Sequence, residues 1–174
     1  MAEILDLYNE QNNPLGITKP RADVHRDGDW HRTVHIYVLN YHGQFLAHLC
    51  SPFKDAKPNC WDTRFGSHVT EGMDYEQTAT QELEQEIGIS ITADKLIVRQ
   101  KQNFDDGTNR EHIQVYSYCF NGAINNLHFN DNEIVEVKWM SSIEIIKEIK
   151  EKPERWACGI QNFETINKFI KKII

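Results

Sequence analysis

The sequence predicts an α/β protein in which a mixed β-sheet packs between helices. Short segments of alternating apolar and polar residues, typical of strands, recur between residues 3 and 140. A strongly patterned helix interrupts them at 75–87, and two helical segments follow the last strand. Because 174 residues is an ordinary size for one domain, we expect a single domain over 1–174.

The N-terminal part is expected to form a hairpin followed by a polar loop. Residues 3–9 alternate, turn-forming residues occupy 12–16, and a return strand begins at 17–18. Residues 19–32 are polar and are expected to form a loop. Further strands are expected at 33–40, 45–50, 96–103, 112–121 and 133–140, a strand and loop at 61–69, and helices at 141–150 and 153–172.

Local signals mark both ends of the helix at 75–87. Asp74 is placed as its N-cap, and Gln77, three residues later, completes a capping box. Gly88 stands where a left-handed residue is needed after the last turn. The stripe expected to be buried consists of Tyr75, Ala79, Leu83 and Ile87.

An acidic pair lies beside this stripe. Glu82 and Glu86 are one helical turn apart, and a like-charged pair at this spacing costs a helix about 0.2–0.5 kcal/mol. A hard divalent cation such as Mg²⁺ between the two carboxylates would reverse that sign. The sequence therefore predicts a metal site, with a solvated acidic helix face as the alternative.

Composition excludes several classes of protein. A formal net charge of −7 without a basic patch argues against a nucleic-acid polymer as partner. No apolar run approaches the roughly 18 residues of a membrane span, and the acidic start lacks the basic region of a signal peptide. Four cysteines without CxxC spacing are typical of reduced thiols, so we expect a cytoplasmic protein.

Residues 65–89, FGSHVTEGMDYEQTATQELEQEIGI, resemble the Nudix box, G-x5-E-x7-R-E-U-x-E-E-x-G-U, where U is bulky and aliphatic. The matching positions are Glu82, Leu83, Glu86, Gly88 and Ile89. The departures are Ser67 at the first Gly, Met73 at the first Glu, Gln81 at the Arg and Gln85 at the next metal-binding Glu. The resemblance implies the alpha/beta/alpha sandwich of the Nudix family, with an N-terminal hairpin and C-terminal helices.

The resemblance also implies a metal, Mg²⁺ or Mn²⁺, held by Glu82, Glu86 and the backbone carbonyl of Ser67. Gln85 replaces one family ligand, and because a neutral amide oxygen is a weaker ligand than a carboxylate, we expect weakened metal binding. The family's Glu–Arg brace is replaced by the uncharged pair Met73 and Gln81, which leaves no orphan charge.

The stretches VHRDGDWHRTVHIYVLN and NDNEIVEVKWMS are similar to the Nudix branch related to isopentenyl-diphosphate isomerase. This resemblance implies an alternative metal cage, which consists of His25, His31, His68 and Glu111. Asn109 stands at the cage's second Glu, and Gly66 stands where the isomerase has its Cys. Hydrogen-bonded bracing of the loop is the other interpretation of these histidines.

The implied function is metal-dependent hydrolysis of a small diphosphate substrate of the nucleoside-diphosphate type. Glu111 and Glu86 are the candidate general bases, and His68 is a candidate phosphate contact. Two alternatives stay open. One is isomerase-like activity on isopentenyl diphosphate, which Gly66 disfavours, and the other is a catalytically weak fold that binds a ligand or partner.

Overall fold

The computed structural model describes residues 2–54, 56–129 and 133–171. The strands are β1 (Ile4–Tyr8), β2 (Pro14–Pro20), β3 (Trp30–Leu39), β4 (Phe45–Cys50), β5 (Trp61–Asp62), β6 (Arg64–His68), β7 (Ile97–Asp105), β8 (Arg110–Cys119) and β9 (Ile134–Met140). The helices are α1 (Arg21–Asp27), α2 (Tyr75–Ile87), α3 (Ser142–Glu151) and α4 (Ile160–Lys171), and a 3-10 turn covers Pro153–Arg155. Within these residues no helix is long and apolar enough to cross a membrane.

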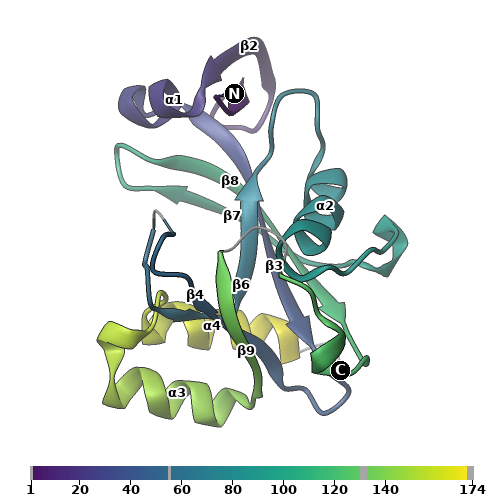
Figure 1. Cartoon of the computed structure of the whole chain (residues 1–174). Coiled ribbons are helices and arrows are strands. Elements are labelled where there is room, and N and C mark those ends of the chain that lie inside the picture. The colour runs from purple at the N-terminus through teal and green to yellow at the C-terminus, as the bar shows by residue number, and fades with distance from the viewer. Residues whose placement is uncertain (1, 55, 130–132, 172–174) are drawn as a thin grey trace.

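The strands form one mixed sheet with β3 at its centre. β3 pairs in parallel with β8 along its whole length and antiparallel with β6, while β7 pairs with the outer edge of β8. β4 pairs with β9 and β5, and it joins β3 only at the Leu39–Phe45 turn. The sheet thus divides into a β7-β8-β3-β6 part and a β9-β4-β5 part that diverge from this turn (Figure 1).

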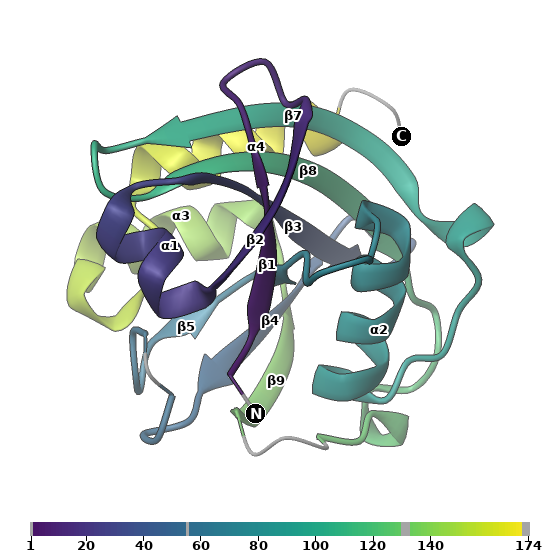
Figure 2. The same ribbon diagram turned by 90° about the horizontal axis from the view of Figure 1, so that it is seen from above.

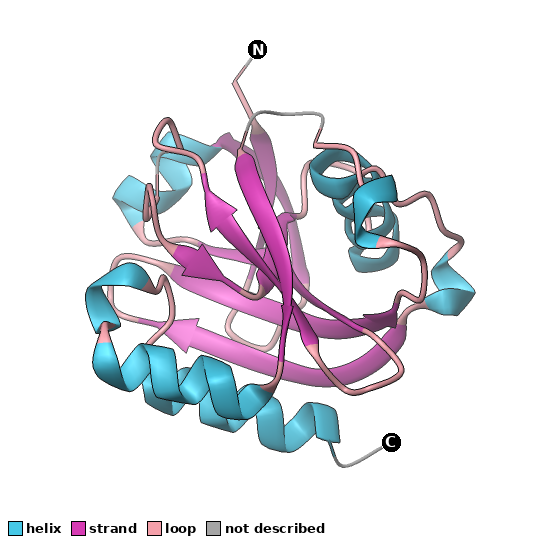
Figure 3. Ribbon diagram, turned by 60° about the horizontal axis from the view of Figure 1, so that its bottom comes forward, coloured by secondary structure: helices cyan, strands magenta, loops and turns pink. Residues whose placement is uncertain are grey.

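Helices cover the sheet on two sides, which gives the predicted sandwich. Seen from above, α2 lies on one side of the strands and α3 and α4 on the other (Figure 2). Figure 3 shows α3 and α4 side by side along one face. Two apolar cores fill these interfaces, one beneath α2 around Leu83 and Phe65, and one beneath α3 and α4 around Phe45 and Phe163.

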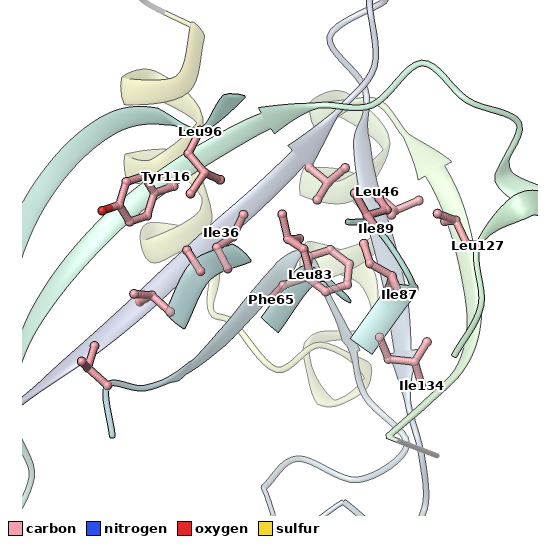
Figure 4. Packing of buried hydrophobic residues seen from close by; sticks show 14 residues of the cluster. Ile36, Leu46, Phe65, Leu83, Ile87, Ile89, Leu96, Tyr116, Leu127 and Ile134 are labelled. Atoms are coloured by element: carbon pink, nitrogen blue, oxygen red, sulfur yellow. The ribbon is translucent and has the colours of Figure 1, made fainter. Parts of the chain in front are cut away.

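The end signals of α2 were predicted correctly. Asp74 accepts a hydrogen bond from Gln77 N (2.8 Å), and the Gln77 side chain accepts one from Asp74 N (3.0 Å). Gly88 has φ of 69°, a left-handed conformation that a residue with a Cβ adopts only with strain. Of the predicted stripe, Ala79, Leu83 and Ile87 are fully buried, whereas Tyr75 is only partly buried. Figure 4 shows Leu83 and Ile87 in this core.

Four expectations were wrong. Residues 14–16, expected in the turn, already belong to strand β2. The segment 19–32 contains helix α1 rather than only a loop, because Val24 is its single buried residue and gives no apolar periodicity to recognise. The last helix begins at Ile160, not at 153, because Trp156 is extended and bridges to Trp61. The solvated alternative for the acidic pair is also wrong, since Glu82 and Glu86 are only 8% and 4% exposed.

Candidate metal and diphosphate site

A cavity of about 870 Å³ opens between the two parts of the sheet and the N-terminal segment. It is lined by most of the residues that the sequence singled out, namely Ser67, Glu82, Gln85, Glu86, His25, His68, Asn109 and Glu111. They come from α1, β6, α2 and the start of β8, which are far apart in the chain. The fold therefore brings the box residues and the cage residues to one cavity.

The acidic pair enters the cavity from α2. Because Leu83 and Ile87 anchor the helix in the core, Glu82 and Glu86 on the adjoining face are held in place and shielded from solvent. Gln85 lines the same cavity, although it is exposed. Desolvated carboxylates favour protonation or a nearby cation, so this arrangement suits a divalent metal.

Lys54 also lines the cavity, although it was not among the residues predicted from the sequence. Its Nζ atom lies 2.7 Å from Glu133 Oε2 and 3.5 Å from Glu86 Oε1. Burial alone would lower the pKa of Lys54, but the neighbouring charges of Glu86 and Glu133 outweigh it and hold that pKa above its usual value. Lys54 lies in a loop without periodicity, so no sequence pattern marked it.

Three histidines form a second cluster at the cavity. His25 of α1, His31 of β3 and His68 of β6 each offer a ring nitrogen, and these atoms lie within 4.8 Å of one another. His31 Nδ1 is 3.1 Å from the carbonyl oxygen of Asp29, which favours the tautomer with a proton on Nδ1 and a lone pair on Nε2. In the described part of the chain, Nε2 of His25 and Nε2 of His31 are buried and make no hydrogen bond.

Two carboxylates border this cluster. Glu111 Oε1 lies 3.9 Å from His31 Nε2 and accepts a hydrogen bond from Asn109 Nδ2 (3.0 Å). On the other side, Glu3 Oε1 lies 3.6 Å from His68 Nδ1. The interaction with His68, and more weakly that with Arg21, lowers the pKa of Glu3 against the effect of burial. No sequence pattern marks Glu3, because the folding of the N-terminal hairpin brings it to the cluster.

The chemistry of the histidine cluster fits a borderline metal such as zinc. Burial lowers the pKa of His31 to about 4 and also lowers that of His25, so both rings are neutral at pH 7, the form that binds metals. Bracing accounts for His31 Nδ1 but not for the buried Nε2 atoms. Buried nitrogen atoms without partners are costly, and a metal would satisfy them.

Gly66 of β6 pairs with His35 of β3, and its α-carbon lies close to the neighbouring strand. A Cβ atom added at Gly66 would lie 2.6 Å from the carbonyl oxygen of Val34 and 3.3 Å from His35 Cδ2. Because the first contact is with backbone, a side chain at this position requires the two strands to move apart. The backbone at this position therefore accommodates glycine but not the side chain of a cysteine.

Comparisons with known proteins agree with this fold. The family model of the NUDIX domain matches residues 29–158. Nudix hydrolase 3 of Arabidopsis thaliana is 37% identical over 93 residues, which cover 53% of this chain and 12% of that protein. The isopentenyl-diphosphate Delta-isomerase of Aliivibrio fischeri (strain MJ11) is 25% identical over 97% of this chain and 94% of its own length.

A crystal structure from Deinococcus radiodurans has a TM-score of 0.72 and 26% identity, and it covers 94% of this chain and 98% of that one. The chain belongs to the Nudix family, since the family model spans most of it. The predicted family and fold class are thereby confirmed. The family match and the hydrolase relatives also support the prediction of a Nudix-type hydrolase.

Proposed function

We propose that the protein hydrolyses a diphosphate linkage in a small substrate, with a divalent metal held by Glu82 and Glu86. The observation that carries this proposal is the position of two nearly buried carboxylates, one turn apart, at the wall of a large cavity. The backbone carbonyl of Ser67 completes the ligand set that the resemblance implies. When bound, Mg²⁺ or Mn²⁺ supplies charge neutralisation and lowers the pKa of a water ligand.

The remaining cavity residues have roles that follow from their charge. Arg21 and Arg64 line the cavity and would bind phosphate oxygens, as would His68. Glu111 is the candidate general base outside the box, and its hydrogen bond from Asn109 fixes the carboxylate at the cavity wall. Glu86 is the alternative base within the box. All four cysteines are free thiols, which supports a reducing compartment such as the cytoplasm.

The experiment that tests this function uses a panel of nucleoside diphosphate conjugates and isopentenyl diphosphate with Mg²⁺ or Mn²⁺. It measures the nucleoside monophosphate and the second phosphorylated product from the conjugates, and isopentenyl monophosphate and free phosphate from isopentenyl diphosphate. We expect metal-dependent hydrolysis of at least one class of diphosphate and none with EDTA. Binding of a diphosphate without turnover would favour the binding fold. Interconversion of isopentenyl diphosphate and its allylic isomer would favour the isomerase, which the tight packing at Gly66 opposes.

As the alternative role of His68 and Glu111, we propose that they form a metal cage with His25 and His31. Replacing His31 with Gln is expected to remove about one equivalent of bound zinc, because a buried ligand nitrogen is lost. Metal content after dialysis measures this. The exposed His42, replaced by Gln, is the matched control and should leave zinc content unchanged. Equal zinc content in both variants would support the bracing interpretation.

Restoring the family ligand by Gln85→Glu is expected to tighten Mg²⁺ binding. A carboxylate at this cavity-lining position adds a charged oxygen ligand beside Glu82 and Glu86. Isothermal calorimetry in the absence of substrate is the measurement, with Gln81→Glu, also exposed on α2, as the control. Affinity that is unchanged or weaker in Gln85→Glu would show that position 85 does not face the metal.

A further inference from the structure

Lys54 places a positive charge where the proposed metal would bind. Its ammonium group lies 3.5 Å from Glu86 Oε1, and the side chains of Glu86 and Lys54 are only 5% and 23% exposed. Solvent and salt screen such a pair less than a surface pair. Lys54 therefore forms an ion pair with Glu86 and occupies the side of the carboxylate where a metal ion would bind.

The backbone links Lys54 more closely to Glu133 than to Glu86. Ser51 N donates a hydrogen bond to Glu133 O (2.7 Å), and Lys54 N donates one to Ser51 O (3.2 Å). The loop that carries Lys54 leaves β4, which pairs with β9 just after Glu133. Glu86 belongs to α2, whose buried side chains pack in one core with Leu46 of β4 and Ile134 of β9, whereas the loop of Lys54 is tied to Glu133 by backbone hydrogen bonds. If Lys54 leaves Glu86, it therefore keeps Glu133 as its partner.

We propose that Lys54 competes with the divalent metal for Glu86 and is retained by Glu133 when the metal binds, so that Lys54 sets the metal affinity of the site. This inference rests on the proposed metal site at Glu82 and Glu86. Two cations close to one shielded carboxylate repel each other strongly, because the effective dielectric constant there is lower than in water. A metal that engages Glu86 must displace the ammonium group.

The absence of a carboxylate at position 85 makes this competition more consequential. Glu82 and Glu86 alone bring two negative charges to the metal from α2, and Lys54 offsets one of them. With so few charges at the site, each one contributes a large part of the electrostatic attraction for a divalent ion. The site should therefore bind a metal ion only at a higher metal concentration than it would need without Lys54.

The test measures Mn²⁺ binding in the absence of substrate, by calorimetry or by electron paramagnetic resonance. Lys54→Met is expected to tighten Mn²⁺ binding about tenfold or more, because the competing cation is removed. Lys54→Arg, which keeps the charge, should remain within about threefold of the wild type. Lys57→Met is the matched control, since Lys57 lines the same cavity from the same loop. It should change affinity by about twofold or less.

A double-mutant cycle distinguishes two roles of Glu133, which are retention of Lys54 and direct binding of the metal. Glu133→Gln should weaken Mn²⁺ binding in the wild-type background, because Lys54 then has Glu86 as its remaining partner. In the Lys54→Met background the same change should weaken Mn²⁺ binding much less, because only the more distant negative charge of Glu133 is lost. Equal weakening in both backgrounds would mean that Glu133 binds the metal directly, and the proposed retention would be overturned.

Unchanged or weaker Mn²⁺ binding in Lys54→Met overturns the competition. If that variant does not fold, Glu133→Gln in the wild-type background decides, and unchanged affinity there overturns the proposal. Wild-type Mn²⁺ binding that is lost in Glu86→Gln but insensitive to Lys54 contradicts only this inference. Mn²⁺ binding that is insensitive to Glu86→Gln contradicts the proposed metal site itself.

Discussion

Replacing Glu86 with Gln is expected to lower metal-dependent diphosphate hydrolysis about 100-fold or more while leaving the fold intact. Even residues that only support a metal ligand typically cost 10–100-fold when removed, and Glu86 is the more buried of the two proposed carboxylate ligands. The carboxamide is nearly isosteric and relieves repulsion with Glu82. The measurement is kcat/KM with Mn²⁺, together with a thermal melt that reports folding.

The matched control for this variant lies on the same helix. Glu84 is exposed, and its Oε1 accepts a hydrogen bond from Ser90 Oγ (2.8 Å) on the outside of the fold. Glu84→Gln makes the same chemical change and should alter kcat/KM about twofold or less. A comparable loss in both variants would mean that net charge, not metal ligation, controls the rate.

The double variant Glu82→Gln/Glu86→Gln tests whether the two carboxylates act as a unit. If they share one metal ion, the double change should be little worse than either single change, because the first already removes the metal-dependent rate. Additive losses would show that the two residues act independently. In that case Glu86 would have a role of its own, such as the general base.

The part of the fold with strong local signals was predictable from sequence. The bounds of α2 were predicted correctly because a capping box, a left-handed glycine and an apolar stripe all act within a few residues of the helix. Strand β4 was also predicted correctly at both ends. By contrast, α1 has seven residues with one buried side chain, so tertiary contacts rather than periodicity determine it.

The residues of the candidate site were predictable only where they belong to a sequence pattern. Glu82 and Glu86 are marked by their spacing and by the resemblance to the box, and the structure adds their burial. Lys54 and Glu3 carry no pattern, because each reaches its partner through strand pairing or loop folding between distant segments. The ion pair between Lys54 and Glu86 spans 32 positions in the chain, which local sequence rules do not describe.

Replacing Leu83 with Ala is expected to reduce the free energy of unfolding by about 2–5 kcal/mol. Leu83 lies on the buried face of α2 and is fully buried, in the same core as Ile36, Leu46 and Phe65 (Figure 4). The change removes this apolar contact and leaves a void that these neighbours fill only in part. Urea unfolding followed by circular dichroism measures the loss.

The control for Leu83 is Ile143 on α3, a helical aliphatic residue that is 78% exposed. Ile143→Ala should change the free energy of unfolding by about 0.5 kcal/mol or less. A cost below that value for Leu83→Ala as well would mean that the stripe of α2 does not hold the helix on the sheet. Because Glu82 precedes Leu83 directly, a loosened helix would also misplace a proposed metal ligand, so we expect Leu83→Ala to weaken Mn²⁺ binding and Ile143→Ala to leave it unchanged.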